Sequence, residues 1–164
     1  LDGLLAAGLV ERAPEAHAGP GRPGHLYRLT ELASDPFPQA HRELASELVT
    51  FMAADQVERF FAQRTARTEA QVAPELAGLS LEEKVRRIGR LAAAGGHMTE
   101  VTDNGDGSFA IRHCNCPIAD VAAATGAPCH HEQALYERLL GASVERTTWQ
   151  AKADASCTYV VKAK

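Results

Sequence analysis

The sequence predicts an α+β protein built from part of a winged helix, a long helix and a small α/β domain. A Gly/Pro-rich loop separates two short strand patterns near the start, the longest amphipathic pattern follows, and all four cysteines lie in the last third. A helix followed by two strands around a protruding loop is typical of the back half of a winged helix. We place the domain boundaries at residues 1–35, 36–78 and 79–164.

The first domain alternates between helical, strand and loop patterns. Residues 1–9 carry leucines near one face of a helix, and residues 10–13 and 25–30 have strand character. The glycines and prolines of residues 18–24 fit neither a helix nor a central strand. Because the chain opens inside an apolar helical pattern, we expect the winged helix to be N-terminally truncated, with its recognition helix upstream of Leu1.

The second domain begins at the break marked by Pro36 and Pro38 and contains the longest helical pattern, from residue 40 to about residue 65. Its apolar stripe consists of Leu44, Leu48, Phe51, Met52, Val57, Phe60 and Phe61. A helix with such a face must pack against another surface. A second copy of the chain is a natural candidate, so we expect one long dimerisation helix and a homodimer.

The third domain opens with a capping box, in which Ser80 begins a helix and Glu83 stands three residues later. Gly95 and Gly96 end that helix. The remaining predicted elements are a hairpin with strands at 97–102 and 108–113, helices near 117–125 and 129–140, and strands at 143–149 and 156–161.

Composition and charge narrow the function classes. The 164 residues are 45% hydrophobic and 23% charged, which is ordinary for a globular protein. We expect no membrane partner and a cytoplasmic location, since no apolar stretch is long enough to span a bilayer and no leader pattern opens the chain. The net charge of −4 weighs against nucleic-acid binding but allows a compact basic face. No catalytic motif stands out, so we expect neither an enzyme nor a small-molecule substrate.

The four cysteines, Cys114, Cys116, Cys129 and Cys157, are the main candidates for chemistry. In the reducing cytosol, clustered thiols more often bind metal or sense redox state than form disulfides. Cys116 precedes a predicted helix and Cys129 opens the next, where the helix dipole and free amides lower thiol pKa values. Their spacing, C-x-C-x12-C-x27-C, matches no standard zinc pattern. From spacing alone they are either metal ligands or ordinary buried cysteines.

Several short segments carry a further similarity. They are AAGLVER at 6–12, GRP at 21–23, YRLT at 27–30, NCPI at 115–118, PC at 128–129, VERT at 144–147 and CTY at 157–159. In this order, and over nearly the whole chain, they resemble the SufR-type repressors. These are iron–sulfur-sensing regulators of cluster-assembly operons with an ArsR/DeoR-like winged helix-turn-helix.

The resemblance implies a homodimer with one iron–sulfur cluster per subunit, 4Fe–4S rather than 2Fe–2S, bound by Cys116, Cys129 and Cys157. Cyanobacterial members have a fourth cysteine between the last two of these, and the nearest position here is Ser143. Another group must therefore complete the site; the candidates are Cys114, His113, His130, His131 and Glu132. The cluster-loaded dimer is expected to bind double-stranded operator DNA and repress transcription.

In the winged-helix interpretation, Arg22 in the loop is the main predicted DNA contact, because it can reach a minor groove or phosphates. Arg28, His25 and Arg12 are weaker candidates, since strand residues at the base of a wing often pack or pair instead. His97 is expected at the surface. Two alternatives remain open, a zinc-binding winged-helix sensor that uses all four cysteines and a thiol-redox regulator without metal.

Overall fold

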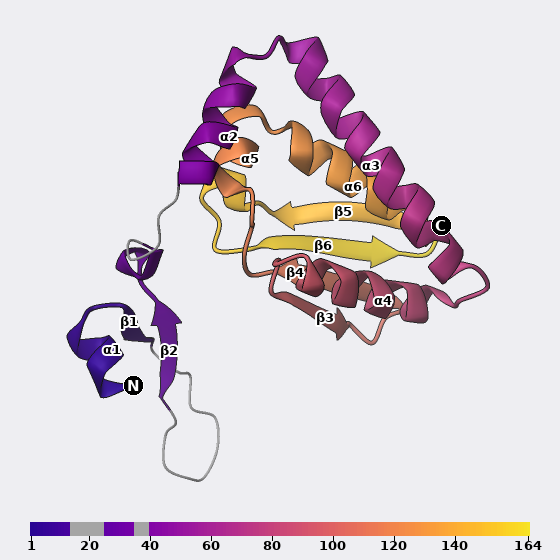
Figure 1. Cartoon of the computed structure of the whole chain (residues 1–164). Helices are drawn as coiled ribbons and strands as arrows, with labels where there is room; N and C mark the ends of the chain where they lie inside the picture. Colours follow the sequence, from indigo (N-terminus) through magenta and orange to yellow (C-terminus); the bar gives the residue numbers. More distant parts are fainter. Residues whose placement is uncertain (14–24, 35–39) are drawn as a thin grey trace, which may run out of the picture. The chain divides into compact units, whose positions relative to one another are not determined.

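The computed structural model of the chain describes residues 1–13, 25–34 and 40–164, and it is mixed α+β, as the sequence predicts (Figure 1). It divides into two compact units, Leu1–Ala40 and His41–Lys164. Among the described residues, no helix is long and apolar enough to cross a membrane.

The first unit contains a small antiparallel hairpin. Val10 lies opposite Leu29, and Ala13 lies opposite Leu26. Both strands fall where the sequence predicts them, whereas the preceding helix ends at Ala6 instead of running to residue 9. The predicted loop at residues 18–24 and the break at residues 36 and 38 lie outside the described residues, so the wing stays a prediction. The elements are α1 (Asp2–Ala6), β1 (Val10–Ala13), β2 (Leu26–Leu29) and the 3-10 helix η1 (Glu31–Ser34).

The second unit is a four-stranded antiparallel sheet covered by helices, with strand order β3-β4-β6-β5. Helices α4 and α6 share one core with the sheet, and α3 packs against α6 (Figure 1). The elements are α2 (Ala40–Phe51), α3 (Ala54–Leu76), α4 (Leu81–Ala94), β3 (Thr99–Asp103), β4 (Ser108–His113), α5 (Ala119–Thr125), α6 (Ala127–Leu140), β5 (Ser143–Thr148), the 3-10 helix η2 (Gln150–Lys152) and β6 (Cys157–Lys162).

The expectation of a single helix over residues 40–65 is wrong. The helix is interrupted at Met52 and Ala53, where Ala53 has an extended backbone. A second helix, α3, then continues to Leu76. The Gln56 side chain accepts a hydrogen bond of 3.0 Å from the Ala53 N–H, so this backbone donor at the start of α3 has a partner. The break lets α2 and α3 fold towards each other around Phe61, which is buried. Part of the predicted apolar stripe therefore forms a core within the subunit.

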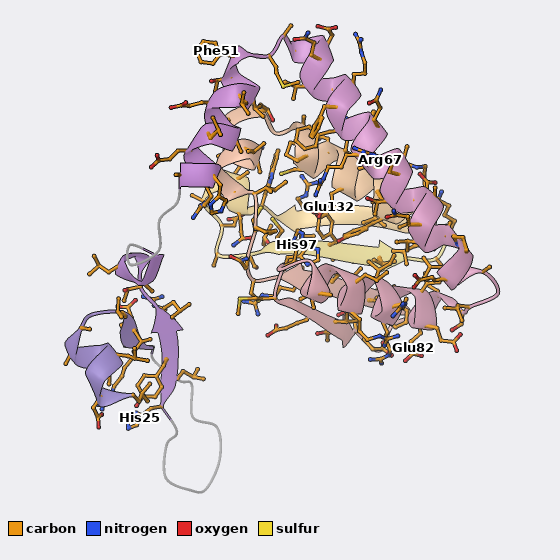
Figure 2. The ribbon with its side chains drawn as sticks, viewed as in Figure 1. His25, Phe51, Arg67, Glu82, His97 and Glu132 are labelled. Carbon is orange, nitrogen blue, oxygen red and sulfur yellow. The ribbon has the colours of Figure 1, made fainter. Side chains whose placement is uncertain are left out.

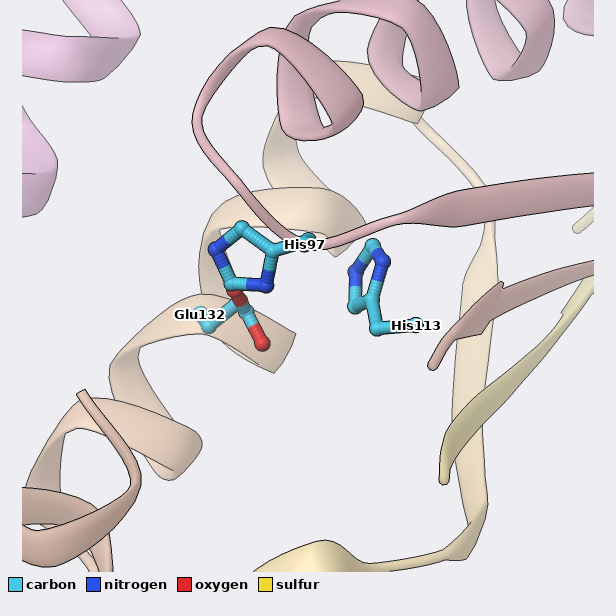
Figure 3. Close-up of side chains that lie close together, drawn as sticks. All are labelled: His97, His113 and Glu132. Carbon is cyan, nitrogen blue, oxygen red and sulfur yellow. The ribbon is translucent and has the colours of Figure 1, made fainter. Parts of the chain in front are cut away.

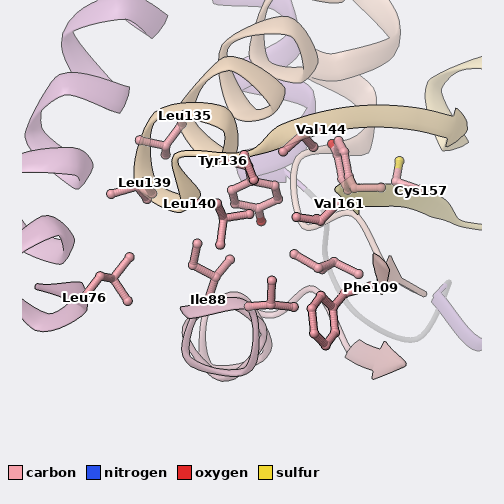
Figure 4. Close-up of a cluster of buried hydrophobic side chains, with 14 residues drawn as sticks. Leu76, Ile88, Phe109, Leu135, Tyr136, Leu139, Leu140, Val144, Cys157 and Val161 are labelled. Carbon is pink, nitrogen blue, oxygen red and sulfur yellow. The ribbon is translucent and has the colours of Figure 1, made fainter. Parts of the chain in front are cut away.

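The main core lies between the sheet and helices α4 and α6 (Figure 4). Inward residues alternate along β4 and β6, as the period of two in a strand requires. Ile111 and Val161 are completely buried there. The predicted capping box is confirmed, because the Ser80 N–H donates to the Glu83 carboxylate at 2.8 Å and the Glu83 N–H donates to Ser80 Oγ at 3.3 Å.

Strand β5 contains a bulge beside the thiol-bearing end of β6. Arg146 lies opposite Tyr159 and Thr148 lies opposite Thr158, so that Thr147 is an extra residue in the ladder. In a regular strand, side chains three positions apart, such as those of Arg146 and Trp149, point to opposite faces of the sheet. The one extra residue in the bulge shifts the alternation, so these two side chains point to the same face. The Arg146 guanidinium accordingly lies 4.8 Å from the centre of the Trp149 ring.

Candidate metal centre

Three of the four cysteines come from three separate segments around one end of the sheet. Cys116 lies in the loop between β4 and α5, Cys129 in the first turn of α6, and Cys157 at the start of β6. Gly126, in the left-handed conformation with φ +69°, begins α6, and its carbonyl accepts from the Cys129 N–H at 3.1 Å. All three thiols are free. Cys129 and Cys157 are buried, and Cys116 is half-buried.

The three thiols lie within range of one another's charge. Burial is the main cause that raises the pKa of the Cys116 thiol to about 11, and the charges of Cys129, Glu132 and Cys157 raise it further. Burial likewise raises the pKa of Cys157, and the charges of Cys129 and Glu132 add to the effect. The fold thus brings together residues that are up to 41 positions apart in the sequence.

The electrostatics of this group favour a cationic occupant. Burial also raises the pKa of Cys129, and Glu132 adds to that rise, so the Glu132 charge disfavours all three thiolates. The expectation of lowered pKa values at Cys116 and Cys129 is therefore wrong, because burial is the larger effect. Three thiolates beside a carboxylate, away from bulk water, are costly unless a cation compensates them. A metal supplies that compensation and displaces the thiol protons when it binds.

Two side chains, Arg146 and Trp149, favour the charged form of the Cys129 thiol. The Arg146 guanidinium donates to the Cys129 carbonyl, and its charge lowers the pKa of Cys129 and Cys157. The Trp149 indole also favours the Cys129 thiolate. Arg146 Nε is buried and has no hydrogen-bond partner among the described residues. Buried N–H groups seldom stay unpaired, so this donor is a candidate partner for an acceptor at the site.

Three of the candidates for the fourth donor, His131, His130 and Cys114, have different surroundings. His131 Nε2 lies 2.9 Å from Glu58 Oε2, on the side facing α3. His130 packs edge-on against Trp149, with ring centres 5.6 Å apart. Cys114 is half-buried, and its carbonyl accepts from Gln150 Nε2 at 3.5 Å, while the Gln150 N–H donates to Cys157 Sγ at 3.3 Å.

A second group of donor atoms consists of His97, His113 and Glu132, whose side chains lie close together (Figure 3). Their ligand atoms lie within 4.8 Å of one another. His113 is only 1% exposed, and both ring nitrogens are paired, Nδ1 with Thr99 Oγ1 at 2.8 Å and Nε2 with the Tyr136 hydroxyl at 3.0 Å. Burial, together with the charge of His97, lowers the pKa of His113 to about 4. His113 is therefore a neutral residue with no free ring nitrogen.

The expectation that His97 lies at the surface is wrong. Its side chain is only 20% exposed, its ring centre is 4.7 Å from that of His113, and its Nε2 is 3.9 Å from Glu132 Oε1. His97 precedes β3 and Glu132 lies on α6, so no sequence spacing announces the contact. Only the fold brings the two side chains together.

The predicted DNA contacts belong to the first unit. Arg22 lies outside the described residues. Arg28 is 69% exposed, and its Nε donates to Glu11 Oε1 at 2.5 Å across the hairpin. His25 and Arg12 are also exposed. DNA contact by these residues stays a prediction.

No family model, curated protein or solved structure matches this chain. The site therefore has to be interpreted from its own geometry. That geometry describes an α+β protein in which Cys116, Cys129, Cys157 and Glu132 lie within electrostatic range of one another at one end of the four-stranded sheet.

Proposed function

We propose that the protein is a homodimeric transcriptional repressor that senses iron–sulfur cluster status through Cys116, Cys129 and Cys157. The observation that carries the proposal is the convergence of these three thiols, from a loop, a helix and a strand, at one partly buried place. Cysteine thiolates are the usual ligands of iron–sulfur clusters, and the buried Arg146 Nε, which has no partner among the described residues, suits a cluster sulfide.

The three cysteines fit a 4Fe–4S cluster with three cysteine ligands. In this proposal, the protein that carries the cluster is the form that binds DNA. When bound, the cluster would supply a covalent crosslink that is sensitive to oxidants. Cys116, Cys129 and Cys157 would hold it, while Arg146 would offset part of the negative charge at Cys129 and Cys157. A group that binds one arrangement of these segments stabilises that arrangement by linkage.

The segment after Cys116 offers a route from the site to the proposed dimer helices. Ile118, two residues on, packs against the buried cluster that includes Val57 and Phe61 of α3. Arg42 on α2 donates to Asp120 on α5 at 2.9 Å. Release of Cys116 would therefore loosen contacts that hold α2 and α3. In a dimeric winged-helix protein, small changes at the dimer helices alter the match to the half-site spacing of the operator.

Helix α2 offers a surface for the second subunit. Leu44, Leu48 and Phe51 follow one helical face and are each more than half exposed, with Phe51 at 90% (Figure 2). Such a contiguous apolar face on a soluble protein is typical of an interface.

The proposed function is tested by anaerobic purification followed by a visible absorption spectrum and iron and sulfide analysis. A brown protein with near-stoichiometric iron and sulfide is expected, and Cys116→Ser, Cys129→Ser and Cys157→Ser should each remove the colour. Operator DNA selected with the loaded protein should bind the cluster-free form much more weakly. A colourless, zinc-containing protein after reconstitution with iron and sulfide would instead favour the zinc sensor, and equal DNA binding by both forms would refute the switch.

A further inference from the structure

The carboxylate of Glu132, in the second unit, lies within electrostatic range of all three thiols. It is the one described carboxylate whose charge acts on Cys116, Cys129 and Cys157 alike. It lies on α6, three residues after Cys129, which places the two side chains on the same face of the helix. We propose that Glu132 is the fourth donor of this site and holds the metal or iron corner that the three thiolates leave open.

Glu132 is held in place by two aromatic neighbours. The Tyr159 hydroxyl donates to Glu132 Oε2 at 2.5 Å, and His97 Nε2 lies 3.9 Å from Oε1. The carboxylate has no Lys or Arg ion-pair partner among the described residues. A half-buried carboxylate without a cation is costly, and coordination to a metal removes that cost. Tyr159 then acts as a positioning residue, because ligating carboxylates are themselves usually hydrogen-bonded.

A cavity beside Glu132 makes this corner accessible to small molecules. It has a volume of about 260 Å³ and lies between α3, α4 and α6, with mostly apolar walls that include Phe61 and Leu135. Pro117 and Pro128, each next to a proposed cysteine ligand, also line it. The Glu132 side chain thus lines this chamber, while its charge acts on the three thiols. A small carboxylate that enters the chamber can take the place of a truncated Glu132 side chain.

This inference rests on the proposed function, because it takes the three thiols to be ligands. The test uses the cluster-free full chain under anaerobic conditions, with Co²⁺ as the probe, since its absorption reports the number of bound thiolates. Glu132→Ala is expected to bind Co²⁺ at least tenfold more weakly, a loss on the order of 10- to 100-fold being usual when support of a metal site is removed. Its thiolate absorption per bound ion should stay unchanged.

Three comparisons sharpen the result. Added acetate should restore Co²⁺ affinity to Glu132→Ala but not change that of the parent protein. Glu132→Cys should raise the thiolate absorption from that of three ligands to that of four. Glu137→Ala, on the same helix, serves as the matched control and should bind Co²⁺ like the parent.

The outcomes separate the inference from the proposed function. If Glu132→Ala matches the parent in affinity and spectrum, another group is the fourth donor and the inference is overturned. The same conclusion follows if Glu132→Cys adds no thiolate signal. If the parent itself binds Co²⁺ without thiolate absorption, the three-cysteine site fails, and the proposed function falls together with the inference.

Discussion

Buried His113 makes the stability of the cluster-free protein sensitive to mild acid. In the folded protein, burial and the nearby His97 lower the pKa of His113 from 6.5 to about 4, while the unfolded chain keeps the ordinary value. The unfolded state therefore takes up a proton first as the pH falls. At a pH above the pKa that His113 has in the unfolded chain, its contribution to the free energy of unfolding is complete. This contribution declines as the pH falls towards the pKa of His113 in the folded protein, and it changes no further below that pKa.

The pKa difference sets the size of the effect. One pKa unit corresponds to about 1.4 kcal/mol, so this single residue removes about 2.5 kcal/mol of unfolding free energy between about pH 7.5 and about pH 4.5. The prediction is measured by urea unfolding at both pH values. His113→Gln lowers stability at neutral pH, because it disrupts the pairs with Thr99 and Tyr136. Its loss on acidification should nevertheless be about 2.5 kcal/mol smaller than that of the parent.

Exposed His41 on α2 provides the control. His41→Gln makes the same substitution outside the hydrogen-bonded group of His113, Thr99 and Tyr136. An acid-induced loss in His113→Gln as large as in the parent would refute the assignment of the effect to His113.

Three further perturbations test the packing, the capping and the interface. A Cβ on Gly89 would lie 2.5 Å from Val101 Cγ2, so Gly89→Ala should lower stability by about 1–2 kcal/mol despite the better helix propensity of alanine, and a raised melting temperature would contradict this. Ser80→Ala removes the hydrogen bond from the Glu83 N–H and should cost about 1 kcal/mol in urea unfolding, whereas an unchanged midpoint would mean that the cap contributes nothing. Phe51→Glu should shift a homodimer towards monomer in sedimentation equilibrium with unchanged circular dichroism, and an intact dimer would exclude this face as the interface.

The elements that local patterns govern could be predicted from the sequence. Strand β4 begins at Ser108 and ends at His113, as its alternation predicts, and the capping box begins α4 at Leu81. The break at Ala53 could not be predicted, because no glycine or proline marks it. Its cause is tertiary, since burial of Phe61 with α2 residues requires the chain to turn back there.

The candidate site could be predicted only in its ligand types. The sequence singles out the three cysteines as candidate ligands, yet their proximity depends on β6 pairing with β4, which sets Cys157 opposite His113. No local pattern specifies that strand order. The proximity of Glu132 to all three thiols follows from the docking of α6 on the sheet, which is again a long-range property.

Because of the bulge in β5, the number of residues in this strand matters more for its pairing than the identity of the extra residue, Thr147. Thr147 is exposed, so another residue can replace it without disturbing the ladder. Deletion of Thr147 would instead move the side chains that follow it to the opposite face of the sheet. Trp149 would then point away from the face that carries Arg146. Natural variants of this protein should accordingly accept substitutions at Thr147 and reject insertions or deletions between Arg146 and Trp149.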